Sequence, residues 1–214
     1  NPTSGDFSVM LNSIHAAQTP HTFLYRDKEV ETSGNPLAHA IIRGSVNKHG
    51  RSIPNYHYED LLLLSDMYLS RGFQNPFIVC DVNHNNSGKV FSEQPRIVHE
   101  VLHSRIHNDT LHKLVRGVMI ESFIEEGNQK VDGHVYGKSI TDACIGWPET
   151  ERLLRYMAEH VYPGRSWSVW VPQTGPSQNF LQIPFPPCQT APADLQYNCN
   201  PSVEPQGGIF YEDY

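Results

Sequence analysis

The sequence predicts an α/β fold built from parallel β/α units, and two observations lead to that prediction. Short apolar runs alternate with longer segments of helical periodicity, as in parallel β/α units. Two of the runs, residues 79–82 and 117–120, lead directly to polar clusters that contain His84 and Glu121. An α/β barrel places its chemistry in this way, at the C-terminal ends of parallel strands, with its helices packed outside.

The first part of the chain predicts one helix, a hairpin and a buried strand. Asp6 is suited to cap a helix over residues 7–17. Runs rich in β-branched and aromatic residues at 21–25 and 29–32 predict the hairpin. The apolar run 38–42 predicts the buried strand, and a polar loop follows it over residues 45–55. The predicted apolar face of the helix consists of Val9, Met10, Ile14 and Ala17.

The middle of the chain predicts three further helices separated by two strands. The leucine-rich helix at 58–70 is followed by Gly72 in the usual stop position. The last helix begins with Pro148 in its first turn, near two acidic residues that suit the positive end of a helix dipole. The remaining predicted elements are a helix at 95–106 and strands at 77–82 and 115–120.

The composition changes at Pro163, since nine of the 16 prolines lie from there onward. We expect two parts, residues 1–162 as the α/β part and 163–214 as an extended Pro- and aromatic-rich tail that wraps a surface. Cys188 and Cys199 lie in this tail and could pair, whereas Cys80 and Cys144 sit within predicted elements and are expected to be reduced and buried.

Charge and hydropathy exclude several classes of protein. The 16 basic and 23 acidic residues give a net charge of −7 without a basic block, which argues against nucleic-acid binding. No apolar run approaches the roughly 20 residues that a membrane span needs. A cytoplasmic, reducing compartment is the default expectation.

Three residues are candidate ligands of one divalent metal ion: His84, Glu121 and Asp142. Each lies at or just beyond the end of a short apolar run, so we expect them to converge at one mouth of the fold together with Arg43. The alternative is that they are solvated strand-end residues. His99, His103 and His107 share one helix face; they could chelate a metal ion, but we interpret them as a solvated helix face.

Seven short motifs occur along the chain in a fixed order. They are Pro-His-Thr-Phe-Leu (20–24), Ile-Ile-Arg-Gly (41–44), Pro-Asn-Tyr (54–56), Asn-His-Asn-Asn-Ser-Gly-Lys (83–89), Gly-Val-Met-Ile-Glu-Ser (117–122), Glu-Gly-Asn-Gln (126–129) and Tyr-Gly-Lys-Ser-Ile-Thr-Asp-Ala-Cys-Ile-Gly-Trp (136–147). In these motifs and in their order, the chain resembles the type I 3-deoxy-D-arabino-heptulosonate 7-phosphate (DAHP) synthases. The resemblance covers roughly residues 1–161, and the last motif is highly specific.

The resemblance implies a (β/α)₈ (TIM) barrel that condenses phosphoenolpyruvate with erythrose 4-phosphate, the first step of the shikimate pathway toward aromatic amino acids. His84, Glu121 and Asp142 match three ligands of a divalent metal ion (Mn, Fe, Co or Zn), and Arg43 matches an arginine that binds the phosphate of phosphoenolpyruvate. The family's cysteine ligand, its active-site lysine and further arginines have no counterpart here. A departure from the family is Asn83, where serine is usual.

These observations leave two hypotheses for function. A closed barrel takes ~250 residues, and only three good barrel strands and a hairpin are present, so the chain resembles the C-terminal part of a barrel. As an enzyme it is expected to need the N-terminal portion as a separate chain, to be oligomeric and to be inactive alone; we therefore assign no catalytic residue here. The resemblance also places Phe23 and Tyr25 at a hairpin effector site for aromatic amino acids. The alternative is a non-catalytic, partner-binding protein derived from such a barrel.

Overall fold

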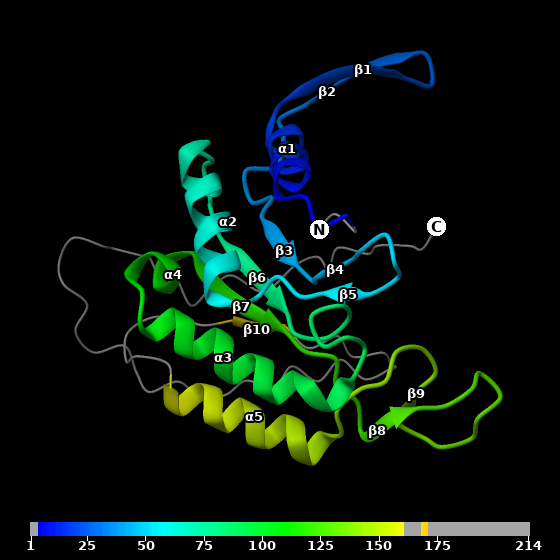
Figure 1. Cartoon of the computed structure of the whole chain (residues 1–214). Coiled ribbons are helices and arrows are strands. Elements are labelled where there is room, and N and C mark those ends of the chain that lie inside the picture. The colour runs from blue at the N-terminus through cyan, green and yellow to red at the C-terminus, as the bar shows by residue number, and fades with distance from the viewer. Residues whose placement is uncertain (1–3, 161–167, 171–214) are drawn as a thin grey trace, which may run out of the picture. The chain divides into compact units, whose positions relative to one another are not determined.

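The computed structural model describes residues 4–160 and the backbone of residues 168–170. Within these residues, helices alternate with parallel strands (Figure 1). The helices are α1 (Phe7–Gln18), α2 (Tyr58–Ser70), the 3₁₀ turn η1 (Phe91–Glu93), α3 (Gln94–Ile106), α4 (Asp109–Leu114) and α5 (Trp147–His160). The strands are β1 (His21–Tyr25), β2 (Lys28–Thr32), β3 (Ala40–Ile42), β4 (Ser45–Val46), β5 (Ser52–Ile53), β6 (Ile78–Asp81), β7 (Val115–Met119), β8 (Glu125–Asn128), β9 (Lys138–Ser139) and β10 (Ser168–Trp170).

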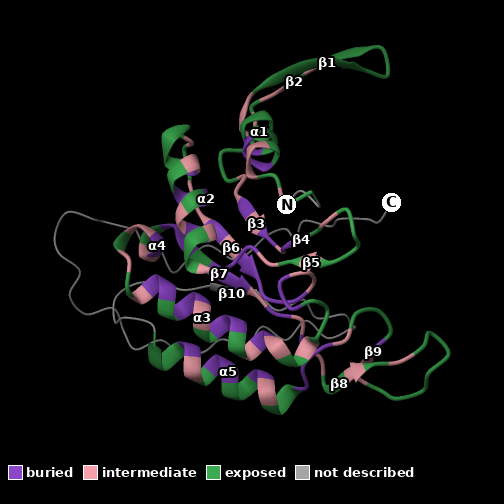
Figure 2. Ribbon diagram, viewed as in Figure 1, coloured by how far each residue is buried: buried purple, intermediate pink, exposed green. Residues whose placement is uncertain are grey.

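A four-stranded parallel sheet, in the order β10-β7-β6-β3, forms the centre of the fold. Its register aligns Ile42 with Cys80 and Cys80 with Val118, so these side chains point to the same face. All three are buried and belong to the hydrophobic core, together with residues of α1 to α5 (Figure 2). The helices therefore cover this face of the sheet, as expected for parallel β/α units.

The opposite face of the sheet is less well covered. Ile41 and Val79 are aligned neighbours on this face, and Met119 lies on it opposite Asp81, two residues further along the ladder. All three are only half-buried, whereas the residues immediately before and after each of them are buried. The described part of the chain thus leaves one apolar face of the sheet partly open.

The β1–β2 hairpin projects from the end of α1, away from the sheet (Figure 1). Its strands pair from His21–Thr32 to Tyr25–Lys28, so that the second strand begins one residue before the predicted run 29–32. The turn uses Arg26 and Asp27, both at positive φ. Phe23, Leu24 and Tyr25 are exposed by 47%, 80% and 55%, so within the described residues the hairpin adds little to the core.

Helix α1 begins where the sequence predicts. The Asp6 carboxylate accepts hydrogen bonds from the backbone N–H groups of Ser8 (2.8 Å) and Val9 (3.3 Å). The predicted apolar face was partly wrong, because Val9 and Ala17 are exposed and Leu11 is buried. The buried face of the helix is formed by Met10, Leu11 and Ile14, and the helix contacts α2 and β3.

The other differences from the prediction concern short elements. The polar loop 45–55 contains the antiparallel pair β4–β5, whose turn is closed by Asn47 accepting from the N–H groups of His49 and Arg51. Helix α4 was not predicted; Asn108 caps it by accepting from the N–H groups of residues 110 and 111. Strands β8 and β9 were also missed, since each is short and polar.

Most of the predicted tail, residues 163–214, lies outside the described residues, and so do Cys188 and Cys199. The exception is β10, which pairs in parallel with residues 117–119 of β7. The division at residues 162 and 163 stays a prediction. Among the described helices, none has both the length and the apolar character needed to cross a bilayer.

The cap of α1 generates a stability prediction. Replacing Asp6 with alanine leaves two N–H groups of the first turn without their acceptor, so we expect the free energy of unfolding to fall by about 1 kcal/mol. Chemical denaturation followed by circular dichroism measures this. Asp66→Ala is the matched control, because Asp66 is an exposed carboxylate in the middle of α2 and should change stability little. Equal losses in both variants would contradict the capping role.

Candidate metal centre

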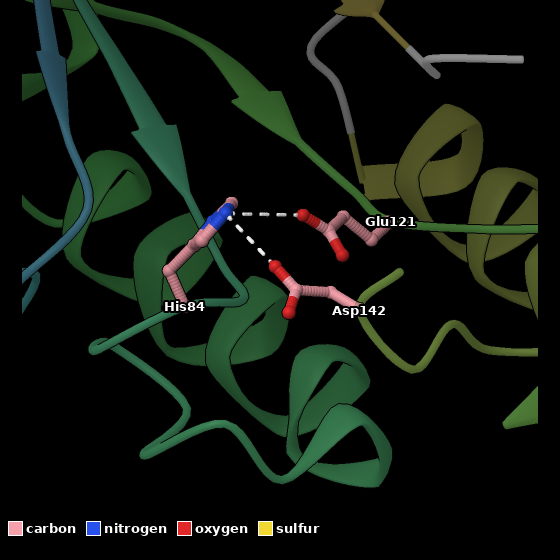
Figure 3. Close-up of side chains that lie close together, drawn as sticks. All are labelled: His84, Glu121 and Asp142. Carbon is pink, nitrogen blue, oxygen red and sulfur yellow. Dashed lines mark ion pairs between the residues drawn. The ribbon is translucent and has the colours of Figure 1, made fainter. Parts of the chain in front are cut away.

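His84, Glu121 and Asp142 come together beyond the C-terminal ends of β6 and β7, as the sequence predicts (Figure 3). One donor atom from each lies within 4.8 Å of the others. His84 Nε2 is 3.2 Å from Glu121 Oε1 and 3.6 Å from Asp142 Oδ2. Residues far apart in sequence thus offer one nitrogen and two carboxylates to a single point.

The His84 ring is oriented by Asp81, the last residue of β6. Asp81 is buried, and its Oδ2 lies 2.8 Å from His84 Nδ1. Because a carboxylate accepts, Nδ1 carries the proton. When the ring is neutral, its Nε2 lone pair faces the space beside Glu121 and Asp142, where an ion would bind. Histidines that bind metals are commonly oriented by such a bond on their second nitrogen.

His84 also has a strained backbone, with φ +45°. Non-glycine residues at positive φ persist only where the surroundings fix them. Here the carbonyl of His84 accepts from the N–H of Lys89 at 2.7 Å, and the N–H of Asn85 donates to the carbonyl of Arg43 at 3.1 Å. The loop after β6 is therefore held on both sides of the histidine.

The hydrogen bond with Asp81 is the largest influence on the pKa of His84, and it raises that pKa above the usual range. Burial acts in the opposite direction, and so does the positive charge of Arg43. A divalent ion takes the same lone pair as a proton, so acid competes with metal at this residue.

Glu121 is fixed at both its backbone and its side chain. The fully buried amide of Gln94, at the start of α3, donates to the Glu121 carbonyl (3.0 Å) and accepts from its N–H (2.8 Å). Asn83 Nδ2 donates to Glu121 Oε2 at 2.8 Å, which leaves Oε1 facing His84. Burial raises the pKa of Glu121, and the nearby Asp142 adds to that shift, while His84 and Asn83 lower it.

Asp142 reaches the centre from a loop and not from a strand of the central sheet, which corrects the expectation for its local structure. The loop follows β9, and single bridges tie its far end to the segment after β7: Gly127 with Cys144, and Ser122 with Ile145. The Asp142 side chain is 53% exposed, compared with 17% for those of His84 and Glu121. Asp142 is thus the solvent-facing member of the group.

Cys144 lies near these residues but does not join them. Its Sγ contacts the backbone carbonyl of Asp142. Burial, with a further contribution from the charge of Glu121, raises the pKa of Cys144 to about 11. Because metals bind the thiolate, a neutral thiol at this position fits the core role expected for it.

The donor set suits a divalent cation. Two carboxylates beside one imidazole carry excess negative charge, and their mutual repulsion contributes to the raised pKa of Glu121. Oxygen and imidazole ligands suit Mn²⁺, Fe²⁺, Co²⁺ and Zn²⁺, and three protein ligands leave positions for water or substrate. His84, Glu121 and Asp142 are the residues that would hold such an ion.

The sequence did not single out three residues that support this centre: Asp81, Asn83 and Gln94. A usable signal existed for Asp81, because a carboxylate closing an apolar strand three residues before a histidine is unusual in a core. Asn83 was noted only as a departure. Nothing in the local sequence indicates that Gln94 turns toward Glu121.

The sequence profile of the DAHP synthetase I family matches residues 4–155. The chain belongs to the DAHP synthetase I family. It is 38% identical over 169 residues to a Trp-sensitive phospho-2-dehydro-3-deoxyheptonate aldolase of Enterobacter agglomerans, covering 75% of this chain and 46% of that protein.

Other members of the family agree. The Haemophilus influenzae phospho-2-dehydro-3-deoxyheptonate aldolase is 38% identical over 173 residues, covering 77% of this chain and 45% of the relative. A solved structure of that enzyme from Francisella tularensis SCHU S4 superimposes with a TM-score of 0.67 and 29% identity, covering 78% of this chain and 48% of that one. The chain thus spans about half the length of these relatives.

The Asp81–His84 bond generates a prediction about pH. The raised folded-state pKa of His84 means that protonation stabilises the metal-free fold. This contribution is complete below the ordinary histidine pKa and is lost as pH rises through the folded-state value. Asp81→Asn keeps the Oδ1 acceptor for the N–H of Asn83 but replaces Oδ2 with a donor. We expect it to lower the pKa of His84 and to weaken stability more in acid than in base.

Two-dimensional NMR titration of the histidine rings measures the pKa directly, and denaturation on both sides of the titration measures the stability. Asp66→Asn serves as the control, since Asp66 is exposed on α2. An unchanged His84 titration in Asp81→Asn would remove Asp81 from the role assigned to it.

Proposed function

We propose that this chain supplies the C-terminal part of a DAHP synthase barrel, which condenses phosphoenolpyruvate with erythrose 4-phosphate to give DAHP and phosphate. The observation that carries the proposal is the meeting of His84, Glu121 and Asp142 within 4.8 Å, in a member of this family. The rest of the barrel comes from residues beyond these 214, and a separate chain can contribute it. The buried, free Cys80 and Cys144 suit the reducing cytoplasm.

The half-open face of the sheet supports the barrel interpretation. In a closed barrel the inner face packs against side chains from the other strands. Ile41, Val79 and Met119 would meet those side chains, and β3 would pair with the preceding strand. The projecting β1–β2 hairpin is then an insertion outside the barrel.

Each residue has a distinct part in the proposed chemistry. A bound divalent ion would act as a Lewis acid on the aldehyde of erythrose 4-phosphate or orient a water molecule. His84, Glu121 and Asp142 hold and orient that ion, and Asp81, Asn83 and Gln94 keep the first two in place. Arg43 lies close enough to lower the pKa of His84, and its guanidinium can bind the phosphate of phosphoenolpyruvate with two hydrogen bonds. C3 of phosphoenolpyruvate attacks the aldehyde, water adds at C2, and phosphate leaves.

One observation favours a second candidate, a non-catalytic protein derived from the barrel. Strand β10, from the predicted tail, pairs with β7 and thereby covers a sheet edge. Covered edges reduce aggregation of an incomplete sheet. A partner-binding protein with this arrangement would need neither substrate nor metal, so the activity of a completed barrel decides between the two.

Reconstitution tests the enzyme proposal. The chain alone should release no phosphate from phosphoenolpyruvate in the presence of erythrose 4-phosphate and Mn²⁺, because a partial barrel cannot position both substrates. Adding the N-terminal portion of a family member as a second polypeptide should restore release. Native mass spectrometry checks that the pair assembles. Turnover by the chain alone, or an assembled pair without turnover, would contradict the proposal; the latter favours the non-catalytic candidate.

Variants of the active pair should separate metal ligands from substrate contacts. His84→Ala and Glu121→Ala should each lower the rate by about 10²-fold or more through loss of metal. Arg43→Ala should mainly raise the KM for phosphoenolpyruvate. Asp132→Ala is the control, since Asp132 is an exposed carboxylate in the loop between β8 and β9. Calorimetric titration with Mn²⁺ should show loss of binding in the first two variants only.

The hairpin generates a prediction about regulation. Phe23 and Tyr25 share one face of β1 with Val30 of β2, while Leu24 points to the other face. We propose that the first face binds an aromatic amino acid in the completed assembly. Phe23→Ser should abolish calorimetric binding of phenylalanine, tyrosine or tryptophan, whereas Leu24→Ser, at an even more exposed site, should not. Absence of binding to the unmodified assembly would end this regulatory proposal.

A further inference from the structure

Exposed histidines cluster on α3 and α5, which lie side by side (Figure 1). Two of them are engaged in an aromatic stack. His99 stacks on Tyr156 with ring centres 3.9 Å apart, and Tyr156 stacks on His160 at the same distance. This column ties α3 to α5 through the ring of His99.

His103 and His107 form a separate pair at the C-terminal end of α3. His107 is the residue that caps the helix, one turn after His103. Their ring centres are 4.2 Å apart and their planes are tilted by 35°. Both side chains are exposed, so a small ion from solvent can reach the space between them.

The ring of His107 is held in one tautomer. Its Nδ1 lies 2.8 Å from the backbone carbonyl of His103, and because a carbonyl only accepts, Nδ1 carries the proton. The lone pair is then on Nε2, which makes no hydrogen bond within the described residues. Histidines that bind metals are commonly held by this bond to a carbonyl. Across residues 4–160, neither ring nitrogen of His103 makes a hydrogen bond or an ion pair, so both are available.

We propose that His103 and His107 bind one divalent transition-metal ion of the Zn²⁺, Ni²⁺ or Cu²⁺ class, at a site separate from the carboxylate-rich centre of His84. Two imidazoles that share one ion at right angles, with metal–nitrogen bonds of about 2.1 Å, have ring centres about 4.6 Å apart. The observed separation of 4.2 Å between the ring centres is close to this value. Histidines four residues apart on a helix form such pairs.

The ligand chemistry separates this site from the first. Imidazole nitrogen favours Zn²⁺, Ni²⁺ and Cu²⁺, whereas carboxylates also accept harder ions such as Mn²⁺. Water completes the coordination, because two side chains supply only two ligands. The ion joins the last turn of α3 to its capping residue, so it also holds the end of the helix in place.

Calorimetric titration of the tag-free chain with Ni²⁺ tests the proposal. The His84→Ala background removes the first site, so that a single binding event remains. His103→Ala and His107→Ala in this background should each weaken that event by about tenfold or more, because one ligand replaces a chelating pair. His160→Ala is the matched control: its Nδ1 also bonds to the carbonyl four residues earlier, but its neighbour there is Tyr156.

The complementary measurement is thermal unfolding. In the His84→Ala background, Ni²⁺ should raise the melting temperature, and that shift should disappear in the His103→Ala and His107→Ala variants. Circular dichroism verifies that these surface variants fold. The proposal is overturned if the background binds no Ni²⁺, if binding survives both variants, or if His160→Ala weakens it equally.

Discussion

The candidate centre depends on how the chain turns after β6, and the buried amide of Asn86 fixes that turn. Asn86 Nδ2 donates to the carbonyls of Asp81 (2.7 Å) and Ile42 (3.3 Å), at the ends of two neighbouring strands. Its Oδ1 accepts from the N–H of Asn55 at 2.9 Å, which attaches the segment before α2. Three parts of the chain are thus joined through one side chain, and a hydrophobic residue there would remove all three hydrogen bonds.

The loop after β6 also lies close to the residue that follows Arg43, and that residue is a glycine. Gly44 has φ +72°, and a Cβ at this position would lie 2.8 Å from the backbone of Asn85 and Asn86. Its N–H donates to Asn55 Oδ1 at 2.8 Å. Close approach of these backbones is therefore part of how Arg43 and His84 come to lie at the same mouth.

Periodicity and helix-boundary residues predicted the central elements well, because burial of one face imposes a repeat that can be read directly. The bounds of α2 were predicted to the residue, and α3, α5, β6 and β7 to within two. Elements without such a repeat were missed: α4 is only six residues long, and β8 and β9 are polar. The three candidate metal-binding residues, which the structure brings together, were selected from motifs at or beyond strand ends. Gln94 and Asn83 were not assigned a role, since their partners depend on how α3 and the loop after β6 pack.

Asn83 links two of the three candidate ligands, His84 and Glu121, through one side chain. Asn83 belongs to the loop that carries His84, and its Nδ2 donates to Glu121 Oε2 at 2.8 Å. Ser87 Oγ, in the same loop, donates to Asn83 Oδ1 at 2.9 Å. Any displacement of that loop therefore carries the imidazole away and releases the carboxylate in the same motion. Asp142 comes from another segment, but single bridges tie that segment to the stretch after Glu121. A change in the position of Glu121 is therefore transmitted both to the loop of His84, through Asn83, and to the loop of Asp142, through the backbone after β7.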